Sequence, residues 1–160
     1  LRPDVIAYNV VICVCEKGEA WEQALLVLFE LRHSGIEPSV ITYNSAISAC
    51  GKSGEWRQAL LVLSAMQQHS IGSDAITYGT LISACEAEAE WQEALALLDE
   101  MLEIALLPSA ITYTVLITAC EKSQEWQSAL QLLDALQRSD LELGVITCSA
   151  AISACEKGGA

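Results

Sequence analysis

The sequence predicts an all-α fold in which antiparallel helix pairs stack into a solenoid. The first observation is a fixed spacing of 35 residues, which is kept by the tryptophans Trp21, Trp56, Trp91 and Trp126 and by the cysteines Cys15, Cys50, Cys85, Cys120 and Cys155. A constant period of this length is typical of repeat proteins, whose units bury their apolar faces only against their neighbours. The second observation is that apolar residues within each unit have helical spacing, and the third is that no long stretch alternates with period two.

Each repeat contains two predicted helices. In the second repeat the first helix is indicated by Tyr43, Ile47 and Cys50, which lie on one helix face, and the second by the apolar stripe that starts at Trp56. The three prolines, Pro3, Pro38 and Pro108, precede first helices, where proline stops the preceding helix and costs no needed hydrogen-bond donor.

We therefore assign one array over residues 1–160. It consists of the four repeats 5–39, 40–74, 75–109 and 110–144 and the half repeat 145–160. Residues 1–4 read as the tail of a preceding repeat, so we expect the chain to be part of a longer array. No targeting segment is found in these residues.

The composition limits the class of protein. Hydrophobic residues make up 52% of the chain, but their runs are far too short to cross a bilayer, so no membrane partner is expected. The formal net charge is −13, which argues against phosphate binding unless the few basic residues are gathered on one face.

The string VITYNSAISACGKSGEWRQALLVLSAMQQHSIGSD, residues 40–74, resembles a pentatricopeptide repeat. The T-Y-N, Lys, A-L and Pro-Asp/Ser landmarks stay in register over essentially the whole chain, although Trp replaces the usual aliphatic residue at Trp56 and its equivalents. The resemblance implies a right-handed solenoid that binds single-stranded RNA with one base per repeat.

No catalytic or metal-binding constellation is found in the sequence, so we expect neither an enzyme nor a cofactor nor a metal site. The repeated cysteines lie on the apolar stripe, and neighbouring helix pairs are too far apart for disulfides between equivalent positions. We expect them to be small buried thiols.

The lysines form one set, with a single member in the first, second and fourth repeats and in the half repeat. We call Lys17, Lys52, Lys122 and Lys157 the lysine set; Ala87 interrupts it. One positive charge per repeat suits one phosphate per nucleotide. The alternative is that each cation complements the dipole at the C-terminal end of a helix. Glutamates precede most of these positions and would weaken the field of the lysines.

An isoleucine starts the first helix of every repeat. We call Ile6, Ile41, Ile76, Ile111 and Ile146 the isoleucine set. It either completes the apolar core or, as the resemblance implies, sandwiches bases between consecutive repeats.

Two positions vary from repeat to repeat. The first variable set is Asn9, Asn44, Gly79, Thr114 and Ser149; the second variable set is Asp4, Ser39, Asp74, Ser109 and Gly144. The resemblance implies that pairs drawn from these two sets select the base. The alternative for the second set is helix capping, because Ser, Asp and Gly are common N-caps. The first set has no such simple structural reading, since Asn, Gly and Thr are mediocre inside a helix.

These observations predict sequence-specific binding of single-stranded RNA, in RNA processing, stability or translation; no DNA partner is expected. By resemblance the setting is an organelle, mitochondrion or chloroplast. The alternative is a scaffold that binds a protein partner, as a peptide or helix, and the net charge of −13 favours it.

Overall fold

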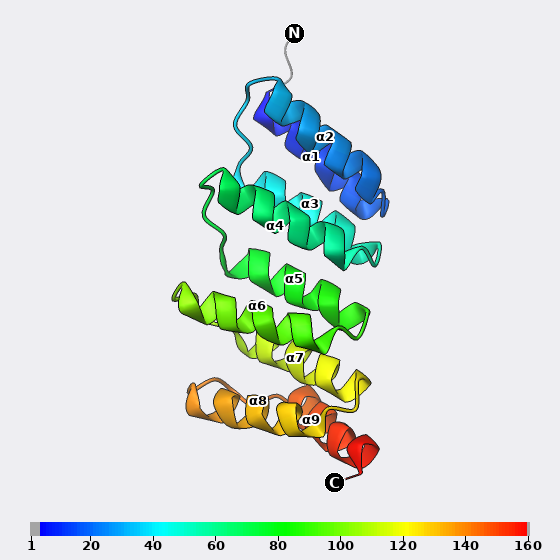
Figure 1. The fold of residues 1–160 in the computed structure, drawn as a ribbon, viewed down its shortest axis with the longest axis vertical. Helices are drawn as coiled ribbons and strands as arrows, with labels where there is room; N and C mark the ends of the chain where they lie inside the picture. Colours follow the sequence, from blue (N-terminus) through cyan, green and yellow to red (C-terminus); the bar gives the residue numbers. More distant parts are fainter. Residues whose placement is uncertain (1–3, 160) are drawn as a thin grey trace. The chain divides into compact units, whose positions relative to one another are not determined.

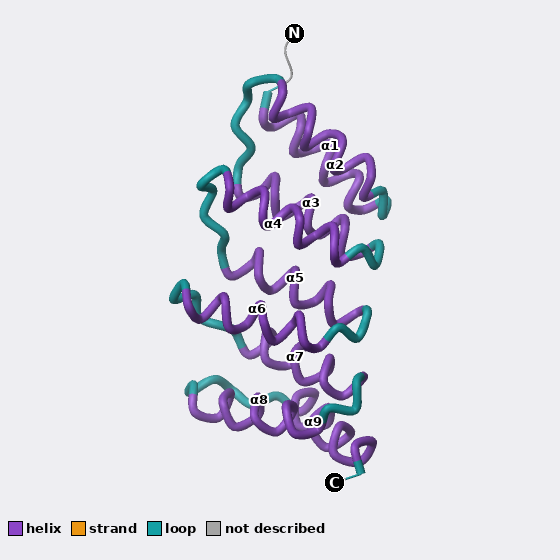
Figure 2. Tube along the Cα trace, in the orientation of Figure 1, coloured by secondary structure: helices purple, strands orange, loops and turns teal. Residues whose placement is uncertain are grey.

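The computed structural model describes residues 4–159, so the expected tail at 1–4 lies outside the described residues except for Asp4. Within this range the chain forms nine α-helices and no strand, which confirms the predicted all-α class (Figures 1 and 2). The helices are α1 (Val5–Lys17), α2 (Trp21–His33), α3 (Val40–Lys52), α4 (Trp56–Gln68), α5 (Ala75–Ala87), α6 (Trp91–Glu103), α7 (Ala110–Lys122), α8 (Trp126–Arg138) and α9 (Val145–Gly158). The chain divides into two compact units, 1–84 and 85–160, and the division falls within α5.

The first helix of a repeat begins at a polar cap. The Ser39 side chain accepts a hydrogen bond from the Thr42 N–H at the start of α3, and the Thr42 hydroxyl accepts one from the Ser39 N–H, which makes a capping box. Ser109 and Thr112 repeat this arrangement at α7, whereas Gly144 gives α9 no side-chain cap. Capping is therefore one role of the second variable set.

The turns after the helices contain residues with positive φ. Between first and second helices these are Glu19, Gly54, Ala89 and Gln124; after second helices they are Gly35, Ser70, Ala105 and Asp140. A left-handed residue is a common way to end a helix and satisfy its last carbonyl groups. Only some repeats supply the glycine that this conformation favours.

In the first unit, α3 packs against α1, α2 and α4. Tyr43, Ile47 and Cys50 are fully buried, as the apolar spacing of α3 predicts. Burial raises the pKa of the Cys50 thiol to about 11, so it stays neutral and packs as a small apolar group.

In the second unit, α7 packs against α6, α8 and α9. Leu116, Ile117 and Cys120 are fully buried, and Leu132 and Leu136 of α8 complete this core. Burial raises the pKa of Cys120 to about 11 and that of Cys85 to about 12. The described cysteines are all free thiols, and the ones at the two outer repeats are only half-buried.

The tryptophans are less uniform than their spacing indicates. Trp56 is buried, and the Arg57 guanidinium carbon lies 4.4 Å from the centre of its ring. Trp21, Trp91 and Trp126 are half-buried. Within the described range, no helix combines the length and the apolar character needed to cross a membrane.

Candidate nucleic-acid interface

The two variable sets come together at the start of the first helices. Asn44 lies on α3 one turn after its N-terminus, and Asp74 immediately precedes α5. The Asn44 amide donates from Nδ2 to Asp74 Oδ1 over 3.2 Å. The sequence pairs these two residues only through the family resemblance, and the structure places them in direct contact.

The Asp74 carboxylate is held by several donors. Its Oδ1 accepts the Thr77 N–H at 2.8 Å in addition to the Asn44 amide. Partial burial would raise the pKa of Asp74, but hydrogen bonds from Thr77 and Asn44 outweigh it and leave the pKa lowered. Asp74 is therefore a carboxylate at neutral pH.

The other members of the first variable set have different surroundings. Asn9 accepts a hydrogen bond from the Thr42 hydroxyl at 2.6 Å, and Thr42 in turn contacts Ser39. Thr114 lies 2.7 Å from the Thr147 hydroxyl and also donates to the Ala110 carbonyl. Gly79 has open space where a Cβ would lie, and Ser149 is exposed.

The isoleucine set lies outside the core. Its five members are between 64% and 76% exposed, which excludes the core alternative for them. Ile41 and Asn44 are three residues apart on α3 and therefore share one helix face. The same spacing relates Ile6 to Asn9 on α1. An exposed apolar side chain thus accompanies each of these two variable residues.

The described ion pairs of the lysine set join consecutive repeats. Lys52 Nζ lies 2.8 Å from Glu16 Oε1 in the first unit. In the second unit, Lys122 lies 2.7 Å from Glu86 and Lys157 lies 2.8 Å from Glu121. Each lysine is also in the last turn of its helix, so the dipole role applies as well.

These ion pairs correspond to a constant spacing in the sequence. Each glutamate of a pair precedes its lysine by 36 residues. Gly51 occupies the one position where the glutamate is missing, and Ala87, 36 residues later, is where the lysine is missing. Sequence reasoning treated the glutamates only as a weakening of the lysine field and did not connect the two gaps.

The paired glutamates are ionised. Partial burial would raise the pKa of Glu16, but hydrogen bonds from Lys52 and Ser48 outweigh it and lower the pKa. For Glu121 the hydrogen bond from Lys157 is the main cause of a lowered pKa, and Ser153 adds to it. These carboxylates therefore compete with any phosphate that approaches the same lysines.

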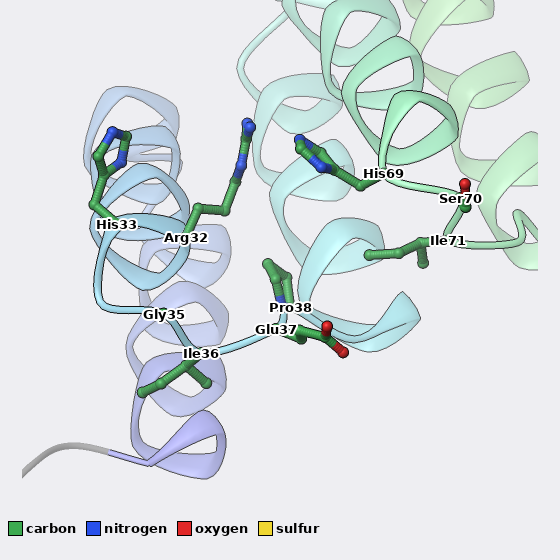
Figure 3. A pocket seen from close by; sticks show the side chains of 9 residues that line it. All are labelled: Arg32, His33, Gly35, Ile36, Glu37, Pro38, His69, Ser70 and Ile71. Atoms are coloured by element: carbon green, nitrogen blue, oxygen red, sulfur yellow. The ribbon is translucent and has the colours of Figure 1, made fainter.

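A polar pocket lies beside the connection between α2 and α3. It is lined by Arg32, His33, Gly35, Ile36, Glu37, Pro38, His69, Ser70 and Ile71. Figure 3 shows the Arg32 and His69 side chains on facing sides of the pocket, and the Glu37 carboxylate points away from both of them. Both histidines are exposed. Among the described residues, no three His, Cys, Asp or Glu side chains are grouped so that they could hold a metal ion.

Comparison with known proteins agrees with the repeat pattern. The PPR repeat family model matches residues 3–52, 38–87 and 73–122, and the PPR repeat model matches residues 111–141. No match was found among curated protein sequences.

Several solved structures are similar to this chain. The pentatricopeptide repeat protein PPR10 in complex with an 18-nt psaJ RNA element is 27% identical with a TM-score of 0.84; the match covers 98% of this chain and 23% of PPR10. PPR10 from maize is 31% identical with a TM-score of 0.75, over 98% of this chain and 22% of that one. This chain thus spans about a quarter of PPR10.

A more distant similarity supports the fold alone. The PPR domain of Arabidopsis thaliana protein-only RNase P 1, in complex with tRNA, is 14% identical with a TM-score of 0.79, over 92% of this chain and 81% of that domain. The family models cover most of the sequence, and the helix pairs match those of solved members. The chain belongs to the pentatricopeptide repeat family.

Proposed function

We propose that this chain is a sequence-specific module for single-stranded RNA that binds one base per repeat. The observation that carries the proposal is the direct contact between Asn44 and Asp74, two residues that vary from repeat to repeat, next to an exposed Ile41. An amide and a carboxylate together offer both a donor and an acceptor to a base edge. The similarity to PPR10, crystallised with RNA, supports the same function.

In this proposal each base stacks between apolar side chains and is selected by the variable pair. Ile41 and Ile76 supply exposed apolar surface on consecutive first helices of the first unit. Stacking of this kind tolerates every base, because every base has a π-face. Selection therefore depends on the polar residues of the two variable sets.

The expected base preferences differ between repeats. By family resemblance, Asn44 with Asp74 prefers uridine, and Asn9 with Ser39 prefers a pyrimidine, with cytidine favoured. Thr114, whose partner position holds Gly144, leans towards a purine. Gly79, with Ser109, has no side chain to offer and leaves its repeat indifferent. The array then reads pyrimidine, uridine, any base and purine.

The lysine set is proposed to contact the RNA phosphates. Three of the lysines form ion pairs with Glu16, Glu86 and Glu121. Each of these ion pairs must open, at least partly, before the ammonium group of the lysine can bind a phosphate. The backbone contribution to affinity is therefore expected to be small for an RNA-binding protein, in keeping with a net charge of −13.

We further propose that the chain itself performs no catalysis and acts in organellar RNA processing, stability or translation, in a mitochondrion or chloroplast. Family membership supports the setting. The role of a base-selecting module is to place a longer protein on one RNA sequence.

The proposal is tested by fluorescence anisotropy with single-stranded RNA over a salt series. We expect binding at low salt that weakens with added salt, stronger for an oligonucleotide containing pyrimidine-uridine-any-purine than for a scrambled one. Absence of binding at low salt would contradict the RNA function, and the protein-scaffold alternative would then lead.

A further inference from the structure

A buried threonine accompanies the variable positions. Thr42, Thr77, Thr112 and Thr147 form what we call the threonine set, one at the third position of each first helix after α1, where Ala7 stands instead. All four are buried, and they are the buried polar residues of the described chain apart from Ser45. A buried hydroxyl needs a partner, so the question is what these hydroxyls bind.

In the first unit they bind the asparagines of the first variable set. The Thr77 hydroxyl lies 2.6 Å from Asn44 Oδ1, and the Thr42 hydroxyl lies 2.6 Å from Asn9 Oδ1. In each case the threonine comes from the repeat that follows the asparagine. In the second unit the Thr147 hydroxyl makes the equivalent contact with Thr114, at 2.7 Å.

These contacts fix which way the amide faces. A separation of 2.6 Å is typical of O–H···O and too short for N–H···O, so the atom facing the threonine is the amide oxygen. At Asn44 the carboxylate provides a second reason, because Asp74 Oδ1 lies 3.2 Å from Nδ2 and would repel an oxygen there. The Thr77 hydroxyl also lies 2.8 Å from Asp74 Oδ1, so its single proton is shared between that carboxylate and the Asn44 oxygen. The carboxylate only accepts hydrogen bonds and keeps the amide nitrogen on its own side, so the Asn44 amide has one stable orientation, with its oxygen towards Thr77 and its amino group as the donor.

The orientation of the amide has a chemical consequence for the base. An amino group pairs with a carbonyl oxygen such as O4 of uracil, whereas the same amide turned by 180° would present an oxygen to the amino group of cytosine. The two orientations have nearly the same shape. Without a fixed orientation, an asparagine at this place could accommodate either pyrimidine.

We propose that Thr77 is a positioning residue that, together with Asp74, sets the base preference of the second repeat by orienting Asn44. Asn9 has Ser39 in place of a carboxylate, so the second group that holds the amide of Asn44 is missing there, and the inference is restricted to Asn44. Thr77 turns the amide oxygen of Asn44 inward, and the amino group then favours uridine over cytidine. This inference rests on the proposed RNA function. It adds the residue that decides which of its two orientations the Asn44 amide adopts. Thr77 itself does not contact the base.

The test is the ratio of affinities for RNAs that carry uridine or cytidine opposite the second repeat. Thr77→Val keeps the shape of the side chain and removes the hydroxyl. We expect the uridine-to-cytidine ratio to fall about threefold or more, as for the loss of one hydrogen bond, with the other positions unchanged. Thr77→Ser restores the hydroxyl and should restore the ratio.

The chain offers a matched control in Thr112. It is buried and shares a capping box with Ser109, but the first variable residue of the preceding repeat is Gly79, which has no amide. Thr112→Val should lower the melting temperature as Thr77→Val does and leave every base preference unchanged. An unchanged ratio in Thr77→Val, or the same change in Thr112→Val, would overturn the inference.

A measurement without RNA separates this inference from the proposed function. In the ¹⁵N–¹H spectrum of the free protein, Thr77→Val should shift the Asn44 side-chain amide resonances, and Thr77→Ser should largely return them. Unmoved resonances would contradict the positioning. Moved resonances in a chain that shows no base preference would instead contradict the RNA function, and with it a role for Thr77 in base selection.

Discussion

At the scale of single residues, the charge of Lys52 interacts with more than one group. Its Nζ lies 2.8 Å from Glu16 Oε1, and the residue is in the last turn of α3, where a cation complements the helix dipole. In the proposed function, Lys52 also contacts an RNA phosphate. Half of the Lys52 side chain is exposed, so the ion pair with Glu16 is weak enough to exchange. A surface pair of this kind stabilises the fold little and still reduces the charge that an approaching RNA meets.

Replacing Lys52 by alanine should weaken RNA binding about equally for every sequence. The slope of log K against log salt should become shallower by ~0.7, as expected for one lost phosphate contact with a single strand. Glu16→Gln should do the opposite and strengthen binding, because it leaves Lys52 without its competing carboxylate. Titrations at four or more salt concentrations measure both. An unaltered slope in Lys52→Ala would restrict Lys52 to the ion pair and the helix end.

The lowered pKa of Glu121 predicts a pH dependence of stability. Its carboxyl pKa is below the ordinary 4.5 because Lys157 donates to it. A depressed pKa contributes stability that is present above the unfolded value of 4.5 and is lost as the pH falls through the folded value. In urea unfolding between pH 6 and 3, Glu121→Gln should therefore lose less stability on acidification than the unsubstituted chain. Asp134→Asn is the control, since its pair with Arg138 is largely exposed and should have little effect. Equal acid sensitivity in the Glu121→Gln and unsubstituted chains would refute the coupling.

At the scale of elements, the turns after the first helices are a place where the sequence is not optimal. Ala89 has φ 60° and Gln124 has φ 61°, in the conformation that Gly54 adopts at φ 75° in the second repeat. A side chain in the left-handed region costs about 1 kcal/mol.

Ala89→Gly and Gln124→Gly should therefore each raise the free energy of unfolding by about 1 kcal/mol. The reverse change, Gly54→Ala, should lower it by a similar amount. Chemical denaturation gives all three values. If both glycine variants were destabilised, the turns would be limited by backbone entropy and not by the positive φ.

The elements themselves could be predicted from the sequence because the repeat shows each pattern several times. The helix face of Tyr43 and Cys50 is confirmed as buried, since apolar spacing and burial have the same cause. The sequence does not indicate that Trp91 is only half-buried, because a large apolar residue at a fixed spacing is typical of the core. Of the four tryptophans, Trp56 is the buried one.

The candidate site was less accessible to sequence reasoning. The pairs Glu16–Lys52 and Asn44–Thr77 join residues of different repeats, and a single repeat read by itself does not show them. Their signals are present all the same. For the glutamate–lysine pairs, the signal is that the glutamate missing at Gly51 and the lysine missing at Ala87 are 36 residues apart, like the paired residues. For the asparagine–threonine pairs, the signal is a threonine at the same position of successive repeats, which is polar and yet buried. Whether the variable sets select bases stays a prediction.

At the scale of the whole molecule, the acidic charge and the small number of repeats both limit what the chain does alone. Four bases give little discrimination, since each good contact is worth ~1–3 kcal/mol if values for base-pair edges transfer to single strands. PPR10 is about four times as long as the part matched by this chain. High specificity is therefore expected from more repeats acting together, each adding its own base.

The central claim is that the first variable set selects bases one repeat at a time. The most direct test is binding selection from randomised single-stranded RNA with this chain and with its Asn44→Thr variant. If the RNA runs 5′ to 3′ along the array as in the family, we predict that the substitution moves the preference of the second repeat from uridine towards guanosine and leaves the other three positions as they were. A preference that stays at uridine, or a change spread over all positions, would contradict the claim.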